Sequence, residues 1–450
     1  MLPELPSSLP PRPAAIGPDE YRQRREALIA QLPNNAALLL PAASLVTRSH
    51  DSEYPFRQQS DFYYLTGIRE PDALLLLLPG RAEGQSVVFC QDRDPTMEAW
   101  TGRRLGAEGV VSLHGIDQAF ENAERDALLP GLLECRELLY APLDNPEAIS
   151  IAEEALAHAQ AGMRRGKPAL KGWLDSRPLT HEMRLIKSPA EIALLRHAAA
   201  ISAQAHVRAM RACRAGLGEY QLQAELEHTF VWQGASGPAY GTIVGGGANA
   251  CVLHYIENSD VLAEDTLVLI DAGAEFDLYA GDITRTFPVN GRFNDAQRAL
   301  YQVVLDAQVR AVEAVAPGAT LADIHQGVVH DLTAGLIELG LLEGDVQARI
   351  DDESYRRFYL HSTSHWLGLD VHDVGTYRLD EATPRPLAPG MVLTVEPGLY
   401  IPADDDIPSA YRGMGIRIED NVVVTEQGHD ILTDGVPKQV AEIEQIMAKK

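Results

Sequence analysis

Residues 267–287 read LVLIDAGAEFDLYAGDITRTF, in which two apolar, strand-like runs are joined by a short polar stretch. If the two runs pair antiparallel with Asp271 opposite Asp282, the turn lies between Phe276 and Asp277. Residues directly opposite in such a pair share a face of the sheet, with Cβ atoms about 5 Å apart. Two carboxylates at that distance repel each other unless a proton or a cation lies between them. The hairpin alone is therefore equally consistent with a metal site and with a loop-capping Asp beside a solvated one.

A second stretch, HSTSHWLGLDVHDVG at 361–375, holds three of the chain's 14 histidines. These are His361, His365 and His372. Neutral imidazole is a ligand for zinc, manganese, iron or cobalt ions and a proton carrier near neutral pH. A single histidine here would more often be structural, but three followed by carboxylates favour a functional site.

Two further strand-like runs carry a carboxylate where a buried strand should be apolar. They are MVLTVEPGLY at 391–400, with Glu396, and GIRIEDNVVV at 415–424, with Glu419. A charge inside such a strand is costly unless it is paired or bound to a metal. Arg417 lies two residues before Glu419 and shares its face. Taken alone, this stretch therefore favours a simple buried ion pair of Arg417 with either Glu.

Together these stretches offer five candidate metal ligands: Asp271, Asp282, His365, Glu396 and Glu419. Four of them are carboxylates and none is a cysteine, which argues against a structural zinc site. The set suits two divalent ions that hold a bridging hydroxide and polarise a carbonyl group. No GxSxG, P-loop or GxGxxG motif stands at a suitable strand–helix junction.

The composition restricts the function classes. Of 450 residues, 46% are hydrophobic, so the chain can build sizeable cores. The formal net charge of −26 repels phosphate backbones and argues against nucleic-acid binding. No run approaches the about 20 apolar residues of a membrane span, and the first residues lack a signal-peptide pattern. Four cysteines without a CxxC pair fit a reducing compartment, so we expect a cytoplasmic protein.

Patterns along the chain predict a Pro-rich arm at 1–17, an α/β domain at 18–175 and a second domain at 176–450. The basic segment 164–172 is interpreted as the linker between them. Ser188, Pro189 and Glu191 form a helix start. Helices at 219–233 and 321–339, each preceded by a longer helix and followed by strand-like residues, hint at a duplicated unit. In the first domain we expect strands at 36–40, 62–65, 73–78, 86–90 and 137–140, and helices at 19–31, 117–129 and 146–163.

The combined motifs resemble the dinuclear-metal peptidases with the pita-bread fold, in their proline-specific branch, the aminopeptidase P (Xaa-Pro aminopeptidase) family. DSEYPFRQQSDFYYLTG at 51–67 and WTGRRLG at 100–106 resemble the N-terminal domain of that family. HEMRLIKSPAEIALLRHA at 181–198 and YAGDITRTFPVNGRF at 279–293 resemble its catalytic domain. The resemblance covers nearly the whole chain except the Pro-rich arm. It implies a creatinase-like α/β N-terminal domain, then an α+β pita-bread domain with an internal pseudo-twofold duplication.

The resemblance also implies roles for the site residues. Asp271 would bind one ion in bidentate fashion, Asp282 and Glu419 would bridge both ions, and His365 and Glu396 would complete the second. The ions would be Mn²⁺, with Zn²⁺ or Co²⁺ possible. The substrate would be a peptide Xaa-Pro-Yaa, whose first residue is released by the bridging hydroxide. Glu396 would carry the proton and Arg417 would orient the carboxylates. The residues implied to contact substrate are His254, His361, His372 and Tyr400.

The family often forms dimers or tetramers, so we expect a homo-oligomer in which Trp100 and Asp51 of a neighbouring subunit reach the pocket. Two positions depart from the family pattern. Ser362 replaces the usual Gly after the first histidine of the HxxSH block, and Glu381 stands where an Arg is usual, although Arg378 is close.

Three other readings remain open at this point. Xaa-Pro dipeptidase (prolidase) shares the fold and metals. Methionine aminopeptidase shares the ligands but does not need the first domain. A non-catalytic pita-bread binding protein, or a metal-free creatinase-like hydrolase, would be expected to have lost ligands that are all present here.

Overall fold

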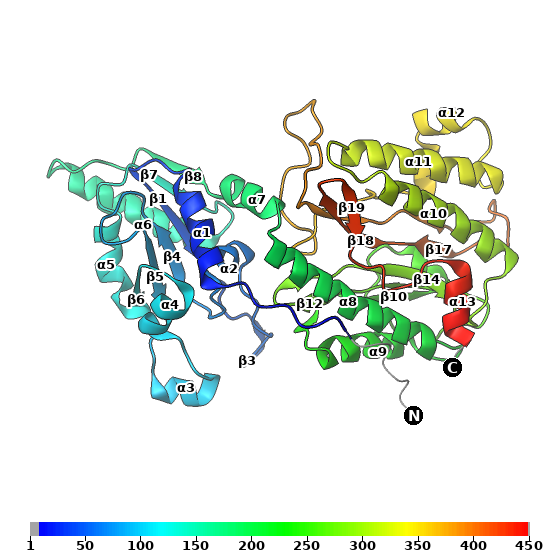
Figure 1. Ribbon diagram of the computed structural model, residues 1–450, viewed down its shortest axis with the longest axis horizontal. Coiled ribbons are helices and arrows are strands. Elements are labelled where there is room, and N and C mark those ends of the chain that lie inside the picture. The colour runs from blue at the N-terminus through cyan, green and yellow to red at the C-terminus, as the bar shows by residue number, and fades with distance from the viewer. Residues whose placement is uncertain (1–8, 449–450) are drawn as a thin grey trace. The chain divides into compact units, whose positions relative to one another are not determined.

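The computed structural model describes residues 9–448 (Figure 1). The chain forms two compact units, which are described separately. The N-terminal unit is Ile16–Arg184. The second unit begins at Leu185, continues to Ala448 and includes residues 9–15; it is called the catalytic unit because its motifs resemble the catalytic domain of the peptidase family.

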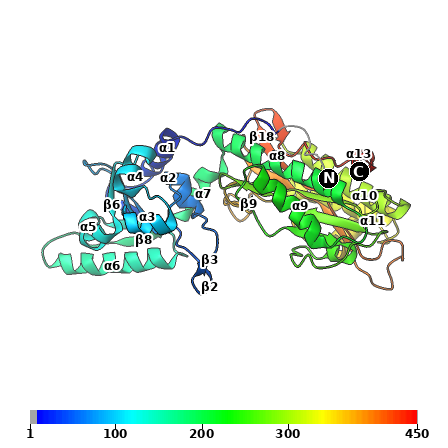
Figure 2. The ribbon, with the colours of Figure 1, turned by 90° about the horizontal axis from the view of Figure 1, so that it is seen from below.

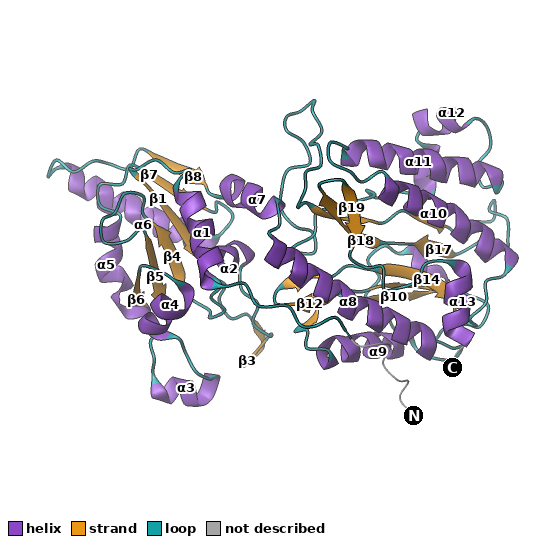
Figure 3. Ribbon diagram, viewed as in Figure 1, coloured by secondary structure: helices purple, strands orange, loops and turns teal. Residues whose placement is uncertain are grey.

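The N-terminal unit is built on a six-stranded mixed sheet in the order β6-β5-β4-β1-β7-β8 (Figure 3). β4 pairs antiparallel with β1 and with β5, whereas β5–β6, β1–β7 and β7–β8 are parallel pairs. The central strands are buried on both faces because helices cover each side. The strands are β1 (Ala36–Pro41), β4 (Leu74–Leu77), β5 (Ser86–Cys90), β6 (Gln118–Glu121), β7 (Leu138–Ala141) and β8 (Gly172–Asp175).

One face of this sheet forms the core with α5 and α6. Ala37 and Leu39 of β1 pack with Ile151 of α6, and all three are buried. Asn145 caps α6 and Pro146 occupies its first turn, and the helix has the bounds that the sequence predicts. The remaining elements are α1 (Pro18–Ile29), β2 (Thr47–Ser49), β3 (Ser52–Glu53), α2 (Ser60–Thr66), α3 (Pro95–Thr101), α4 (Gly106–His114), η1 (Asn122–Glu124), α5 (Arg125–Leu132), α6 (Pro146–Met163) and α7 (Arg177–Leu185).

Three predictions for this unit are wrong. Residues 62–65 form part of helix α2, whose residues are all buried, so its apolar run has no polar face to reveal a helical period. The predicted helix at 117–129 is β6 followed by η1 and the start of α5. The basic segment 164–172 does not join two domains, because it leads from α6 into β8 of the same sheet.

The N-terminal unit extends beyond residue 175. Asp61 of α2 pairs with Arg184 at 2.8 Å, and the Tyr64 hydroxyl donates to the Met183 carbonyl at 3.0 Å. Both contacts attach α7 to this unit. We therefore propose that the domain boundary lies after Arg184.

The catalytic unit contains two pairs of neighbouring long helices beside small antiparallel sheets (Figures 1 and 2). The first pair is α8 (Pro189–Ala212) with α9 (Glu219–Trp232), followed by the sheet β10-β11-β14. The second pair is α10 (Asp295–Glu313) with α11 (Leu321–Glu338), followed by the sheet β15-β18-β19. This repeated order of elements agrees with the duplication that the helix spacing predicts.

The bounds of the strands and short helices complete this unit. The strands are β9 (Gly237–Pro238), β10 (Ile243–Gly246), β11 (Leu267–Asp271), β12 (Ala274–Phe276), β13 (Tyr279–Ala280), β14 (Thr284–Pro288), β15 (Val392–Val395), β16 (Gly398–Ile401), β17 (Met414–Arg417), β18 (Asp420–Thr425) and β19 (Gly428–Ile431). The short helices are η2 (Gly247–Cys251), α12 (Val346–Asp351), η3 (Ser354–Arg357) and α13 (Val440–Ala448).

The predicted hairpin exists, but its register differs from the prediction. Asp271 lies opposite Thr284, not Asp282, and Phe276 pairs with Tyr279. The turn therefore lies between Asp277 and Leu278, whose φ angles of 54° and 70° are those of a tight two-residue hairpin turn. As a result, the two carboxylates are diagonal neighbours across the hairpin.

Two further findings concern expectations for the whole chain. None of the helices in residues 9–448 is long and apolar enough to cross a membrane. Residues 1–8 of the predicted arm lie outside the described residues. Residues 9–17 of the arm have no regular secondary structure. Within them, the Arg12 guanidinium lies 5.1 Å from the centre of the Phe276 ring.

Candidate metal centre and active site

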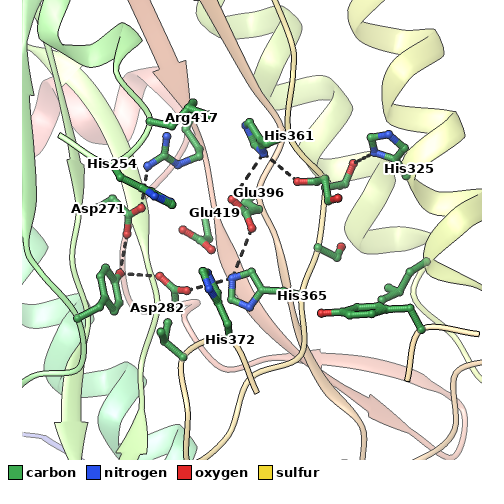
Figure 4. A pocket seen from close by; sticks show the side chains of 18 of the residues that line it. His254, Asp271, Asp282, His325, His361, His365, His372, Glu396, Arg417 and Glu419 are labelled. Carbon is green, nitrogen blue, oxygen red and sulfur yellow. Dashed lines mark hydrogen bonds and ion pairs between the residues drawn. The ribbon is translucent and has the colours of Figure 1, made fainter. Parts of the chain in front are cut away.

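A cavity of about 890 Å³ in the catalytic unit brings the predicted site residues together (Figure 4). Its walls come from the β11–β14 hairpin, the loop after η2, the start of α11 and the segment 361–384. The predicted residues that line it are His254, Asp271, Asp282, His361, His365, His372, Glu396, Arg417 and Glu419.

Asp282, His365 and Glu419 form the centre of this group. One ligand atom from each lies within 4.8 Å of those of the other two, which is close enough for a shared metal ion. The Asp282 backbone N–H donates to Asn421 at 3.0 Å, and the Glu419 N–H donates to the Thr284 carbonyl at 3.1 Å. These backbone contacts join the two halves of the unit at the carboxylates.

Asp271 is held beside this centre by two other side chains. Arg417 donates to it at 2.7 Å. The Tyr240 hydroxyl lies 2.5 Å from an oxygen of Asp271 and 2.5 Å from an oxygen of Asp282. A phenol carries one proton, so it can donate to only one of the two carboxylates at a time.

The hydrogen bonds of His365 direct its other ring nitrogen toward the carboxylates. Nδ1 lies 2.9 Å from the Trp366 carbonyl, which can only accept, so Nδ1 carries the proton. Nε2 then faces Asp282 at 3.3 Å and Glu396 at 3.4 Å. The lone pair on Nε2 would repel the two carboxylates unless a proton or a metal ion lay between them. A histidine that binds a metal through one ring nitrogen usually donates the other N–H to a carbonyl, as Nδ1 does here.

The electrostatics of the cluster favour bound cations. Burial, followed by repulsion from the neighbouring carboxylates, raises the pKa of Glu419 well above its usual range. Burial also raises the pKa of Asp282 and that of Glu396. Burial alone would lower the pKa of His365, but its hydrogen bond to Asp282 raises that pKa to about 9. Four carboxylates gathered in a buried site bind protons or metal ions, and this donor set fits divalent ions.

A hydrogen-bonded chain fixes His361 at the edge of the centre. Arg417 donates to the Tyr400 hydroxyl at 2.9 Å, and Tyr400 lies 2.8 Å from His361 Nε2. His361 Nδ1 lies 2.8 Å from the Ser362 carbonyl, so Nδ1 carries the proton and Nε2 accepts from Tyr400. Burial lowers the pKa of His361 to about 4, which keeps the ring neutral near pH 7.

The other predicted residues are distributed differently. His254 and His372 line the cavity, and the His372 ring packs edge-on against His365 with centroids 4.4 Å apart. Tyr400 is buried behind His361 and does not line the cavity. Trp100, which is 83% exposed, and Asp51, also exposed, both lie in the N-terminal unit and do not line this cavity.

The two departures from the family pattern lie at different places. Ser362 lines the cavity, and its carbonyl is the acceptor for His361. Glu381 is exposed in the loop after Gly375, whereas Arg378 from the same loop lines the cavity.

Several site residues were missed from the sequence because they are neutral hydroxyls or lie on other elements. Tyr240 contacts two ligands, and Thr284 donates to Glu419 at 2.6 Å. Thr363 and His325 form part of the wall next to His361. A threonine in a β-strand carries no unusual signal, so only the pairing of β14 with β11 could have pointed to Thr284.

Comparison with known proteins agrees with this arrangement. Residues 193–426 match metallopeptidase family M24, and residues 21–140 match the aminopeptidase P N-terminal domain. The chain therefore belongs to metallopeptidase family M24, and its catalytic unit has the pita-bread fold that the sequence motifs imply.

Its relatives narrow the class further. The chain is 48% identical to the Xaa-Pro aminopeptidase of Escherichia coli (strain K12), over 96% of this chain and 98% of that protein. It is 34% identical to human Xaa-Pro aminopeptidase 3, over 97% of this chain and 88% of that protein. The structure of Pseudomonas aeruginosa aminopeptidase PepP superposes with a TM-score of 0.94 at 48% identity and covers 96% of this chain and 98% of its own. The structure of E. coli aminopeptidase P with the inhibitor Pro-Leu has a TM-score of 0.93 at 47% identity and covers 97% and 99%.

Proposed function

We propose that this chain is a metal-dependent aminopeptidase that releases the N-terminal residue from peptides with proline in the second position. One observation carries the proposal: a cavity of the catalytic unit gathers four carboxylates and His365, in a chain 48% identical to an Xaa-Pro aminopeptidase over nearly its full length. The prolidase alternative is not favoured, because the relatives from Escherichia coli, Haemophilus influenzae and human, each matched over at least 96% of this chain, are named Xaa-Pro aminopeptidases. The intact ligand set argues against a non-catalytic binding protein.

We propose that two divalent ions would be held by five residues of this cavity, namely Asp271, Asp282, His365, Glu396 and Glu419. Bound there, the ions would polarise the scissile carbonyl and lower the pKa of a water molecule. Oxygen-rich ligation with one imidazole suits Mn²⁺, which we propose as the working metal. A Zn-substituted form of E. coli aminopeptidase P indicates that this site type also accepts zinc.

The side chains of the chain then handle proton and charge. Glu396, whose pKa burial raises, is suited to accept a proton from the attacking water and deliver it to the leaving nitrogen. His361 is neutral, and its Nδ1 lies 3.8 Å from Glu396. Arg417 orients Asp271, and Tyr400 positions His361. His254 and His372 are available at the cavity wall to stabilise the developing oxyanion and to place the proline ring.

The proline nitrogen explains why a dedicated site is needed. An Xaa-Pro bond is a tertiary amide without an N–H, so a peptidase that requires a hydrogen-bond donor there cannot bind it. Selection must therefore rest on the shape of the pocket around the pyrrolidine ring.

We further propose that the protein is cytoplasmic and forms a homo-oligomer, a dimer or a tetramer. Trp100 is a large apolar side chain left 83% exposed on α3, which suits contact with another subunit. In such an assembly Trp100 and Asp51 of a neighbouring copy would complete the substrate pocket.

The test measures hydrolysis of an Xaa-Pro-Yaa tripeptide and of the Xaa-Pro dipeptide. Each substrate is assayed with protein whose metal has been removed by a chelator, and again after Mn²⁺ is added. We expect Mn²⁺-dependent release of the first residue of the tripeptide and poor cleavage of the dipeptide. Cleavage of the dipeptide alone would identify a prolidase. Cleavage of neither would leave a peptide-binding role, to be followed by measuring whether the purified protein holds metal.

A further inference from the structure

A buried hydrogen-bonded chain joins Tyr359 and Thr363 to His325 of α11. The Tyr359 hydroxyl lies 2.8 Å from Thr363 Oγ1, which lies 2.8 Å from His325 Nδ1. Tyr359 and Thr363 are each 1% exposed. Neither hydrogen bond involves a residue to which the proposed reaction assigns a role.

The direction of these hydrogen bonds follows from the number of protons available. Within residues 9–448, the Tyr359 hydroxyl is near no acceptor except Thr363 Oγ1, so it donates to that oxygen. Thr363 must then use its own proton, and its remaining partner is His325 Nδ1, which therefore accepts. Burial lowers the pKa of His325, so the ring is neutral near pH 7. A neutral imidazole that accepts at Nδ1 carries its proton at Nε2.

The His325 side chain lines the substrate cavity, and its Nε2–H group has no acceptor among residues 9–448. His325 lines the main cavity and also an adjoining one of about 160 Å³, which it shares with His361, Ser362 and Arg356. Nε2 is not one of the buried side-chain atoms that lack a hydrogen-bond partner in residues 9–448, so its proton is available to a ligand. Figure 4 shows His325 on the far side of His361 and Glu396 from Asp271.

The charges around the cavity orient a peptide within it. The carboxylates of the metal centre lie at one end, where the scissile bond and the N-terminal residue must be. Arg378 lines the cavity, and Arg356, paired with Glu353 at 3.0 Å, borders the adjoining one. These two cations favour the carboxyl-terminal part of a peptide, so the residues after proline should extend past His325.

We propose that His325 is a specificity-determining residue whose Nε2–H donates to an acyl oxygen of the residue that follows proline. This inference rests on the proposed function and adds a subsite to it. The acceptor is a carbonyl in longer peptides and the terminal carboxylate in a tripeptide. His325 thus favours peptides of three or more residues.

Two variants separate this role from a merely structural one. In His325→Asn the side-chain oxygen can still accept from Thr363, but the side chain is too short to reach the Nε2 position. In His325→Gln the amide reaches the Nε2 position and can donate there, but Thr363 loses its acceptor. Each variant is compared with wild type on Ala-Pro-Ala, on its C-terminal amide and on Ala-Pro amide, which lacks the third residue.

The measured quantity is the ratio of kcat/KM for the tripeptide to kcat/KM for Ala-Pro amide. We expect His325→Asn to lower this ratio about 3- to 10-fold, mainly through a higher KM, which is the effect of one neutral hydrogen bond. His325→Gln should keep the ratio within about twofold of wild type. A loss with both Ala-Pro-Ala and its amide supports a carbonyl acceptor, whereas a loss with the free acid alone supports the carboxylate.

Other outcomes overturn the inference. An unchanged ratio in His325→Asn would exclude the hydrogen bond to the third residue. A larger loss in His325→Gln than in His325→Asn, equal for all substrates, would mean that His325 only orders the loop through Thr363. Failure of the proposed function is recognised separately, because wild type itself would then release no residue from Ala-Pro-Ala with Mn²⁺.

Discussion

Thr284 shows how one uncharged side chain sets the position of two groups at the metal centre. It is fully buried on β14, donates to Glu419 at 2.6 Å and accepts from Arg417 Nε at 3.2 Å. A partner that orients a ligand carboxylate is often worth 10- to 100-fold in metal affinity. The hydroxyl of Thr284 should therefore matter for metal binding more than for folding.

We predict that Thr284→Val weakens Mn²⁺ binding about 10- to 100-fold, with kcat falling in parallel. The measurement is a Mn²⁺ titration of the chelated protein, read by bound metal and by peptidase activity. Thr286→Val is the matched control: Thr286 lies two residues further on the same face of β14, but its hydroxyl contacts the backbone of Arg417. Equal Mn²⁺ affinities in the two variants would contradict the role of Thr284.

The ligands themselves give a more severe prediction. Asp271→Ala and Glu419→Ala should each abolish stable metal binding and lower turnover by about a thousandfold or more, because each removes a carboxylate from the centre. Metal content of the purified variants and tripeptide hydrolysis are the measurements. Glu381→Ala, at an exposed position, is the control and should retain its metal. Turnover that survives in either ligand variant would exclude the metal mechanism.

At this scale, sequence patterns identify the charged residues. Tyr400 was named only through the family resemblance, and the other neutral partners were missed. Glu396 and Glu419 interrupt apolar strands, and this cost of burying a charge makes them visible without a structure. Tyr240 and Thr363 have no such signal, because a tyrosine or a threonine is ordinary in a loop or near a strand. Their roles depend on which loops meet, and that is a property of the tertiary structure.

At the scale of elements, the β11–β14 hairpin determines whether Asp271 and Asp282 meet. Its register depends on Gly273, where a Cβ atom would lie 1.7 Å from the Gly281 carbonyl oxygen. The backbone of Gly281 cannot move aside easily, since it packs against Ala198 of α8. Close approach of two backbones, not a positive φ angle, requires glycine at residue 273.

We predict that Gly273→Ala destabilises the catalytic unit by about 3 kcal/mol and also lowers metal occupancy, because relief of the overlap separates the two carboxylates. Thermal unfolding and metal content test this. Gly327→Ala is the control, since Gly327 is exposed within α11 and a Cβ atom there meets nothing within 4 Å. That substitution should stabilise by up to about 1 kcal/mol. A Gly273→Ala protein with wild-type Tm would disprove the steric argument.

Elements with capping signals were the most predictable from the sequence. Ser188, Pro189 and Glu191 begin α8 as expected, since a capping box and a first-turn proline act locally. The α2 helix was missed because every residue from Ser60 to Thr66 is buried, which removes the amphipathic period. The predicted hairpin register was wrong because the register depends on a turn formed by Asp277 and Leu278. Neither residue is a glycine, so the sequence does not mark the turn.

At the scale of the whole molecule, alternating strands and helices predicted an α/β domain followed by a second domain, and two compact units are present. The end of the first unit could not be placed from composition, because α7 is attached by side chains far apart in the sequence. Asp61 of α2 contacts both Arg184, at 2.8 Å, and His181, at 3.5 Å. Such long-range pairs leave no pattern in a single sequence.

This division predicts two separable unfolding transitions. Every proposed metal ligand lies in the catalytic unit. Removing the metal with a chelator should therefore lower the Tm of one transition only, because that unit loses the stabilisation that metal binding provides. Asp61→Asn should lower the Tm of the other transition, because it removes the charge that Asp61 places 2.8 Å from the buried Arg184 guanidinium. Differential scanning calorimetry of wild type and Asp61→Asn, each with and without chelator, measures the two shifts in Tm. A single transition that both treatments shift together would mean that the units unfold cooperatively.

The Asp61 effect should also depend on pH with a definite sign. Burial alone would raise the pKa of Asp61, but the hydrogen bond from His181 and the charge of Arg184 lower it to about 2. A lowered folded-state pKa gives stability that is fully present above the unfolded pKa of about 3.9 and is lost as the pH falls through 2. Wild type should therefore exceed Asp61→Asn by about 2 kcal/mol near pH 6, and the difference should vanish toward pH 2. Asp144→Asn, at an exposed carboxylate paired with Arg177, is the control and should change stability by less than about 1 kcal/mol at any pH. A difference that persists unchanged at pH 2 would show that Asp61 acts through packing and not through its charge.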